Sequence, residues 1–161
     1  AEAVKMALTS DSELFDIFES GNIDESLQII IEKSLKIKKY VVEEDEKEMG
    51  LRKILNFGHT LAHAIESENG MQNLYHGECV ALGMIPMCSA TVRPRLINVL
   101  KKLGLPTSVN YDTDVIIEAM RHDKKMSGDS INAVYVENIG GFSIKQIPFG
   151  DFCEEVRRCI E

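Results

Sequence analysis

A chain of 161 residues with 44% hydrophobic side chains is long enough to bury one sizeable core, and two independent domains would strain that length. Its formal charge of −8 at pH 7 repels phosphate backbones, so we expect no nucleic-acid partner. The longest uncharged run, near Cys79 to Ala90, is too short to span a bilayer. No charged-then-apolar leader precedes it, so we expect a cytoplasmic protein without a membrane partner.

The cysteines predict no disulfide framework. They show no C-x-x-C pair and no regular spacing, and the chain is large enough to fold without covalent links. We therefore expect reduced, buried or half-buried thiols at Cys79, Cys88, Cys153 and Cys159.

The first third of the chain is predicted to be helical. The chain begins without Met, as if cut into the start of a helix, which indicates a fragment. Ser10 and Glu13 form the S-x-x-E pattern of a capping box, and Gly21 is expected to end the helix that follows. From about Asp24, a second and longer amphipathic helix is expected to run to the acidic residues 43–48, because apolar side chains recur at helical intervals.

The rest of the chain predicts further helices and one hairpin. Leu51 to Ile65 is expected to be a third helix, ending before Asn69. The later elements expected are an apolar segment at 79–87, helices at 94–102 and 115–120, a hairpin of 131–136 with 142–147, and a short C-terminal helix capped by Asp151. The predicted fold class is mainly α, with one small β-hairpin near the C-terminus.

Two histidines lie one helical turn apart in the stretch NFGHTLAHAIE. Residues four apart share a helix face, so His59 and His63 would present their imidazoles side by side, and Glu66 would extend the stripe. Neutral imidazole suits zinc, and His76, in a loop beyond this helix, is a candidate third ligand. Satisfied core histidines are at least as common at this spacing, so both interpretations stay open.

Several cations stand among apolar or acidic neighbours in this acidic chain. They are Lys5, Lys38, Arg52, Lys124 and Lys125. Each alone is more typical of a solvated side chain. If several converge beside a divalent metal, they form a pocket for a carboxylate or phosphate, in which Arg supplies bidentate geometry and Lys a point charge. Asn56, one turn before His59 on the expected helix, would face the same way.

Five motifs occur together in order: AEAVKMAL, LRKILNFGHTLAHAIE, YHGECVALGM, GLPT and HDKKMSG. This combination closely resembles the C-terminal half of the 3-dehydroquinate synthase family, one of the sugar-phosphate cyclases. The resemblance implies that residues 1–161 form the helical zinc- and substrate-binding domain. It also implies that an NAD-binding domain precedes it in a protein about twice as long.

The resemblance assigns roles by position. It implies that zinc, or cobalt, is held by Glu2, His59 and His76, which displaces the simpler pairing of His59 with His63. It implies substrate contacts for Lys5, Lys38, Arg52, Asn56, His63 and Lys124, with Lys5, Lys38, Arg52 and His63 also catalytic and Arg52 suited to a carboxylate. Lys125 and His122 receive no role.

The implied reaction is cyclisation of 3-deoxy-D-arabino-heptulosonate 7-phosphate to 3-dehydroquinate with loss of phosphate, a step of the shikimate pathway to aromatic amino acids. NAD takes and returns a hydride, and no dinucleotide fingerprint occurs in this chain. We therefore expect the chain alone to be inactive, and the full-length enzyme to be a homodimer that binds an anionic sugar phosphate.

Two departures from the family pattern and three alternatives accompany the resemblance. Ala62 stands where the family usually has Gly, and the segment Ile85 to Arg95 is shorter and richer in proline than usual. The alternatives are 2-deoxy-scyllo-inosose synthase or a related cyclase, a metal-dependent alcohol dehydrogenase, and a helical interaction domain whose histidines belong to the core. Arg52 argues against the first, because a substrate without a carboxylate has less use for it.

Overall fold

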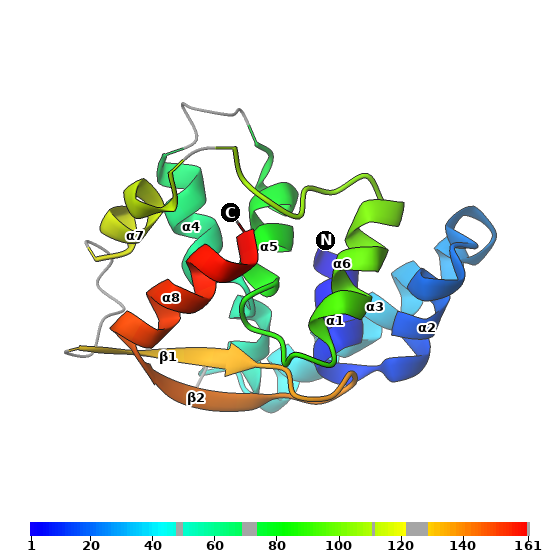
Figure 1. The fold of residues 1–161 in the computed structure, drawn as a ribbon. Coiled ribbons are helices and arrows are strands. Elements are labelled where there is room, and N and C mark those ends of the chain that lie inside the picture. Colours follow the sequence, from blue (N-terminus) through cyan, green and yellow to red (C-terminus); the bar gives the residue numbers. More distant parts are fainter. Residues whose placement is uncertain (48–49, 69–73, 111, 122–128, 161) are drawn as a thin grey trace.

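The computed structural model describes residues 1–47, 50–68, 74–110, 112–121 and 129–160, which form a helical body with one β-hairpin along its edge (Figure 1). The helices are α1 (Glu2–Ser10), α2 (Ser12–Ser20), α3 (Ile23–Glu44), the 3-10 helix η1 (Leu51–Asn56), α4 (His59–Ser67), α5 (His76–Met84), α6 (Arg93–Lys102), α7 (Thr113–Arg121) and α8 (Phe149–Ile160). The strands are β1 (Ser130–Tyr135) and β2 (Ser143–Pro148), paired antiparallel with Ser130 opposite Pro148. The predicted fold class is confirmed.

The boundary between α1 and α2 lies one residue from its predicted place. Asp11, not Ser10, caps α2, because its carboxylate accepts a hydrogen bond of 2.9 Å from the backbone N–H of Leu14. The same carboxylate receives the Lys33 ammonium at 2.9 Å, a long-range contact that the sequence pattern does not reveal. Gly21 ends α2 with φ of 82°, as predicted, and α3 follows as the long helix that the apolar spacing indicated.

The predicted helix from Leu51 to Ile65 is wrong in its first half. Residues 51–56 form the 3-10 helix η1, and α4 begins only at His59. Gly58 has φ of 78°, a left-handed conformation that glycine adopts without steric cost and that redirects the chain between the two helices. The predicted turn at Asn69 lies outside the described residues.

Helices α4 and α5 pack so closely that their contact requires glycine. A Cβ atom added to Gly83 would lie 2.0 Å from the carbonyl oxygen of Gly58, far inside van der Waals contact. Ala62 lies at the same crossing and is fully buried. An alanine at position 62 is therefore accommodated within this crossing.

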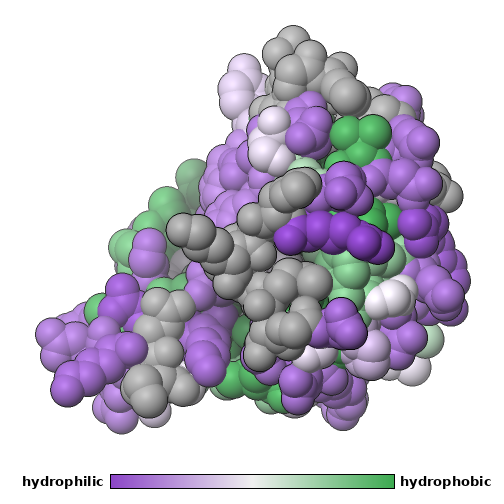
Figure 2. Space-filling model, turned by 90° about the vertical axis from the view of Figure 1, so that its left-hand side faces the viewer, coloured by the Kyte–Doolittle hydropathy of each residue, from purple (hydrophilic) through white to green (hydrophobic). Residues whose placement is uncertain are grey.

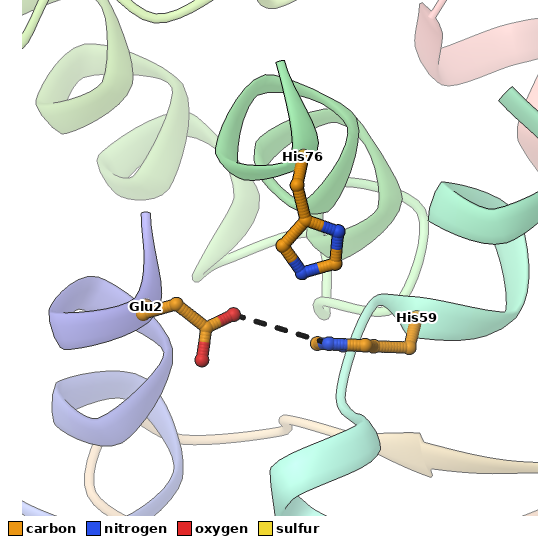
Figure 3. A group of neighbouring side chains, drawn as sticks. All are labelled: Glu2, His59 and His76. Atoms are coloured by element: carbon orange, nitrogen blue, oxygen red, sulfur yellow. Dashed lines mark ion pairs between the residues drawn. The ribbon is translucent and has the colours of Figure 1, made fainter. Parts of the chain in front are cut away.

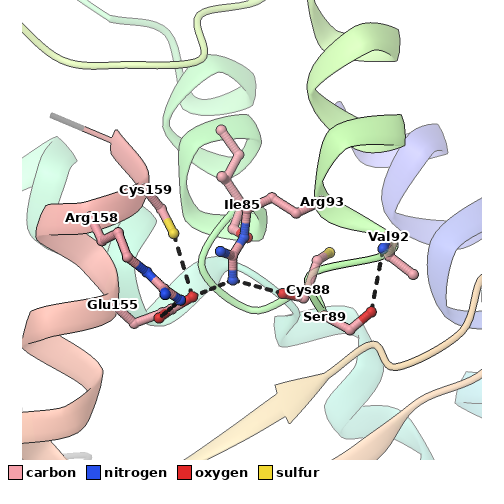
Figure 4. Close-up of polar contacts among 8 residues, drawn as sticks. All are labelled: Ile85, Cys88, Ser89, Val92, Arg93, Glu155, Arg158 and Cys159. Carbon is pink, nitrogen blue, oxygen red and sulfur yellow. Dashed lines mark hydrogen bonds and ion pairs between the residues drawn. The ribbon is translucent and has the colours of Figure 1, made fainter.

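Residues 85–92, which link α5 and α6, contact the segment after β1, and Arg93 at the start of α6 contacts α8. The Cys88 backbone forms a parallel bridge with Val136, just after β1. The Arg93 guanidinium donates to the Cys88 carbonyl at 2.9 Å and pairs with Glu155 of α8 (Figure 4). Because α8 begins at Phe149, Asp151 lies in its first turn and does not cap it, contrary to prediction.

The surface is uneven in its polarity. Hydrophilic residues predominate on the face that lies to the left in Figure 1, with hydrophobic residues visible in small patches between them (Figure 2). On α3, by contrast, Leu27, Ile31 and Leu35 are 50%, 49% and 61% exposed. Within the described ranges, no helix is both long and apolar enough to cross a membrane.

Candidate metal centre

Three side chains that could bind a metal meet where three helices begin. Glu2, His59 and His76 are the first residues of α1, α4 and α5, and each offers a ligand atom within 4.8 Å of the other two (Figure 3). Two imidazole nitrogens and one carboxylate oxygen are a donor set typical of zinc sites that keep a position open for substrate. These residues therefore fit a divalent metal ion.

Both histidines are oriented by an acceptor on the ring nitrogen that faces away from the cluster. Nδ1 of His59 lies 3.2 Å from the Phe57 carbonyl oxygen, and Nδ1 of His76 lies 2.6 Å from Oε1 of Glu66. When Nδ1–H donates a hydrogen bond to this acceptor, the lone pair of the neutral ring is on Nε2. In Figure 3 the Nε2 side of His76 points toward Glu2 and His59, the orientation that a metal ligand needs.

Lys5 is the buried cation of this site. Its side chain is only 2% exposed, and its ammonium donates to the Leu55 carbonyl at 2.6 Å and to Oε2 of Glu2 at 2.8 Å. Burial lowers the pKa of Lys5, the Glu2 carboxylate opposes that shift, and the positive charge of Lys38 adds to it. Lys5 therefore links the carboxylate of the cluster to η1.

The electrostatics favour the protonation states that bind metal. Burial alone would raise the pKa of Glu2, but the hydrogen bond and charge of Lys5 outweigh it and leave the pKa below its ordinary value. Burial, and then the charge of Lys5, lowers the pKa of His59. Near neutral pH the cluster therefore presents a carboxylate and a neutral His59 imidazole, the forms that ligate metal ions.

The N-terminal ends of α1, α4 and α5 lie together at the cluster. The unpaired N–H groups at a helix start carry a partial positive charge, so three such ends favour an anionic group nearby. With Lys5 buried beside them, they make this corner of an acidic protein locally attractive to anions.

The other predicted site residues differ in how the structure relates them to this cluster. His63 is exposed, and its ring centroid lies 5.6 Å from that of His59. Lys38 is exposed on α3, close enough for its charge to act on Lys5. Arg52 is half-buried in η1, where its guanidinium donates to the Glu46 carbonyl at 2.9 Å.

Of the remaining predicted substrate residues, Asn56 is described by the structure and Lys124 is not. Asn56 is the exposed last residue of η1, directly after the Leu55 carbonyl that receives Lys5. Lys124, like Lys125 and His122, lies outside the described residues.

Sequence reasoning missed two contributors. Glu66 was placed on the histidine stripe without a role, although it holds His76. Gly83 was overlooked, although it permits the close contact of α5 with the start of α4. A glycine inside the apolar segment 79–87, where in a helix it costs about 1 kcal/mol relative to alanine, was the available signal for Gly83.

A profile of the family described as "3-dehydroquinate synthase C-terminal" matches residues 1–126. The chain belongs to this family. The matched region contains every site residue predicted above, whereas the hairpin and α8 follow it.

This chain is 44% identical over 156 residues to the 3-dehydroquinate synthase of Campylobacter concisus. The match covers 90% of this chain and 45% of that protein. The chain is 36% identical over 172 residues to the 3-dehydroquinate synthase of Streptococcus sanguinis, covering 98% and 48%. The chain thus spans about half the length of these relatives.

Solved structures share the fold of this family member. Superposition on 2-epi-5-epi-valiolone synthase from Streptomyces hygroscopicus, solved with NAD+ and Zn2+, gives a TM-score of 0.81 at 20% identity, over 98% of this chain and 48% of that one. A 2-deoxy-scyllo-inosose synthase complexed with carbaglucose-6-phosphate, NAD+ and Co2+ gives 0.77 at 22% identity, over 99% and 50%. At these identities the likeness shows the fold alone.

Proposed function

We propose that residues 1–161 are the metal- and substrate-binding domain of a 3-dehydroquinate synthase that converts 3-deoxy-D-arabino-heptulosonate 7-phosphate to 3-dehydroquinate and phosphate. The observation that carries the proposal is the meeting of Glu2, His59 and His76, from three separate helices, beside the buried Lys5. Family membership supports the choice of reaction, and the cluster supports the location of the metal site at which the substrate would bind.

In this proposal Zn2+ or Co2+ is held by Glu2, His59 and His76. Solved relatives of the same fold contain one or the other ion, which supports the choice. When bound, such an ion supplies Lewis-acid chemistry that polarises substrate hydroxyl groups. The carboxylate and the neutral His59 present the protonation states that this binding needs.

The side chains of this domain bind and orient the substrate. We assign the two anionic ends of the substrate to Lys5, Lys38, Arg52, Asn56, His63 and Lys124. Arg52 suits the carboxylate because its guanidinium offers two parallel donors. Holding a flexible sugar acid in one conformation removes entropy before the reaction begins, which is a large part of what positioned cations contribute to a rate.

NAD is assigned to the other half of the protein. Relatives about twice as long as this chain, and solved relatives that contain NAD+, support an N-terminal NAD-binding domain as the partner of this one.

Leu27, Ile31 and Leu35 lie on the same face of α3 as Lys38, because successive residues of this set are spaced by four, four and three positions. This exposed apolar face, continuous with a substrate cation, is our candidate for the surface that the N-terminal domain covers. We propose that the full-length enzyme is a homodimer.

The test uses the full-length protein and this chain in parallel. We expect NAD-dependent phosphate release from 3-deoxy-D-arabino-heptulosonate 7-phosphate by the full-length protein, and none by the 161-residue chain with or without NAD. We also expect about one zinc per full-length subunit by metal analysis. A full-length protein that lacks this activity would refute the proposal.

Substrate choice separates this function from that of other cyclases with the same fold. A hexose 6-phosphate, which lacks the carboxylate, should be a poor substrate. Arg52→Lys keeps the charge but loses the paired donors, so kcat/KM should fall roughly 10- to 100-fold, since a hydrogen bond to a charged group contributes about 1.5–3 kcal/mol. If the hexose phosphate is preferred and Arg52→Lys has no effect, a 2-deoxy-scyllo-inosose synthase activity is favoured instead.

A further inference from the structure

Glu66 makes the shortest polar contact that any residue makes with a member of the metal cluster in the described part of the chain. Its Oε1 lies 2.6 Å from Nδ1 of His76. Glu66 stands two turns after His59 on α4, so one helix face carries both the metal ligand His59 and the residue that contacts His76. Through this contact α4 reaches the first residue of α5.

We propose that Glu66 is a positioning residue of the metal centre, which keeps His76 as the Nδ1–H tautomer with its Nε2 lone pair directed at Glu2 and His59. This inference rests on the proposed function, because it concerns the same centre. Glu66 itself does not touch the metal or the substrate in this role; it acts through His76.

The geometry explains why His76 needs such a partner. His59 is 13% exposed and is held by the packing of α4, whereas the side chain of His76 is 51% exposed. A half-exposed imidazole has freedom to rotate and to exchange tautomers, and each wrong orientation removes a metal ligand. A carboxylate on Nδ1 fixes the ring orientation and the tautomer together, which keeps Nε2 available to the metal.

Helix stability alone does not account for a carboxylate at this position. Glu66 lies in the last turn of α4, where the helix macrodipole disfavours negative charge. Its carboxylate also contributes to raising the pKa of the neighbouring Cys79 thiol, second to burial. The contact with His76 is thus the favourable interaction that this placement gives Glu66.

The experiment measures zinc affinity and the His76 tautomer in the full-length protein. Wild type, Glu66→Gln and Glu66→Ala are titrated with Zn2+ against a competing chelator. We expect zinc affinity to fall about 10-fold in Glu66→Gln, which keeps an acceptor oxygen without charge, and about 100-fold in Glu66→Ala. Glu68→Gln, which removes the same charge at the same helix end, should bind zinc like wild type.

The tautomer gives a readout that does not depend on metal or activity. In metal-free protein at fixed pH, long-range 1H–15N correlations of the His76 ring should show the Nδ1–H form in wild type and a mixture in Glu66→Ala. Circular dichroism checks that each variant folds. If Glu66→Ala does not fold, Glu66→Gln still tests the role of Glu66.

The outcomes are distinguishable. Normal zinc affinity in both Glu66 variants, or an unchanged His76 tautomer in Glu66→Ala, overturns the role of Glu66 while leaving the proposed function intact. A wild-type protein that binds neither Zn2+ nor Co2+ refutes the metal centre of the proposed function, and the role of Glu66 with it.

Discussion

Helices α5 and α3 carry functional residues in opposite ways. Every residue of α5 from Cys79 to Met84 is buried, although the helix has only nine residues. Helix α3 is 22 residues long, yet it buries only Ile30 and Val41, and Leu35 is 61% exposed. The short helix is enclosed by the chain, and the long one lies largely on its surface.

The difference separates two parts of the proposed site. The histidine part is built within this chain, because the chain itself brings Glu2, His59 and His76 together and packs α5 closely against the start of α4. The cation part on α3 is open, because Lys38 and the apolar residues on its face are exposed. We infer that the metal ligands are in place before any partner domain arrives, whereas Lys38 on α3 is not enclosed without one.

The largest predicted effect comes from a substitution that disrupts the close packing of α5 against α4. Gly83→Ala places a Cβ 2.0 Å from the Gly58 carbonyl oxygen, so α4 and α5 must separate. We expect a loss of about 3 kcal/mol in the free energy of unfolding, the upper part of the range for overpacking, measured by urea denaturation. Gly150→Ala is the matched control, because it lies in α8 with nothing within 4 Å of the added Cβ, and it should be neutral or stabilising. Similar stabilities of the two variants would contradict the close crossing.

The next prediction separates ligand from neighbour within the histidine stripe. His59→Ala should reduce zinc affinity more than about 100-fold, the upper end of the loss expected when only a supporting residue is removed. His63→Ala should bind zinc nearly as wild type does, because His63 is not a member of the cluster. Competition with a chelator measures both. Equal losses would instead support the simpler pairing of His59 with His63.

The periodicity of apolar residues, together with the glycine and proline residues at helix ends and turns, predicted most of the architecture. The apolar spacing predicted α3 and α7, Pro94 and the lysine-rich end before Gly104 predicted α6, and the glycine-rich turn between β-branched strands predicted the hairpin. These elements depend on local patterns, which a single sequence displays. The metal ligands were different: Glu2 and His76 lie 74 residues apart, and spacing alone favoured His63 as the partner of His59. The motif resemblance, not periodicity, indicated the set that the structure brings together.

What sequence reasoning could not supply were contacts between elements. The α4–α5 crossing needs the Gly58 carbonyl to meet Gly83, and 25 residues separate them. Likewise, Asp11 gains Lys33 of α3 as a partner, which a local capping pattern centred on Ser10 does not include. Such contacts arise only once the helices pack.

A smaller effect concerns the residue that caps the start of α2. Asp11→Ala should lower the free energy of unfolding by about 1 kcal/mol, because the first turn of α2 loses its acceptor. Asp11→Asn keeps a capping oxygen but loses the charge paired with Lys33, so its loss should be smaller. Thermal unfolding at pH 7 ranks the two. Equal losses would mean that charge, not capping, dominates.

The same pair of variants predicts a pH dependence. Burial alone would raise the pKa of Asp11, but hydrogen bonds from the Leu14 N–H and from Lys33 outweigh it, so the folded-state pKa lies below 3.8. A lowered folded pKa gives stability that is fully present above pH 3.8 and is lost as pH falls through the folded value. The advantage of wild type over Asp11→Asn should therefore shrink below pH 3.8. A constant difference from pH 7 to pH 2 would contradict the ionic contribution.

The smallest predicted effect tests whether the exposed face of α3 belongs to this chain's stability at all. Leu35→Gln should change the free energy of unfolding of the 161-residue chain by less than about 0.5 kcal/mol, as surface substitutions do. Ile30→Ala, on the buried face of the same helix, should cost about 2–5 kcal/mol. In the full-length protein, Leu35→Gln should become clearly destabilising, because the N-terminal domain would then cover a polar amide. If its effect is equally small in both proteins, the apolar face of α3 is not the surface that the partner domain covers.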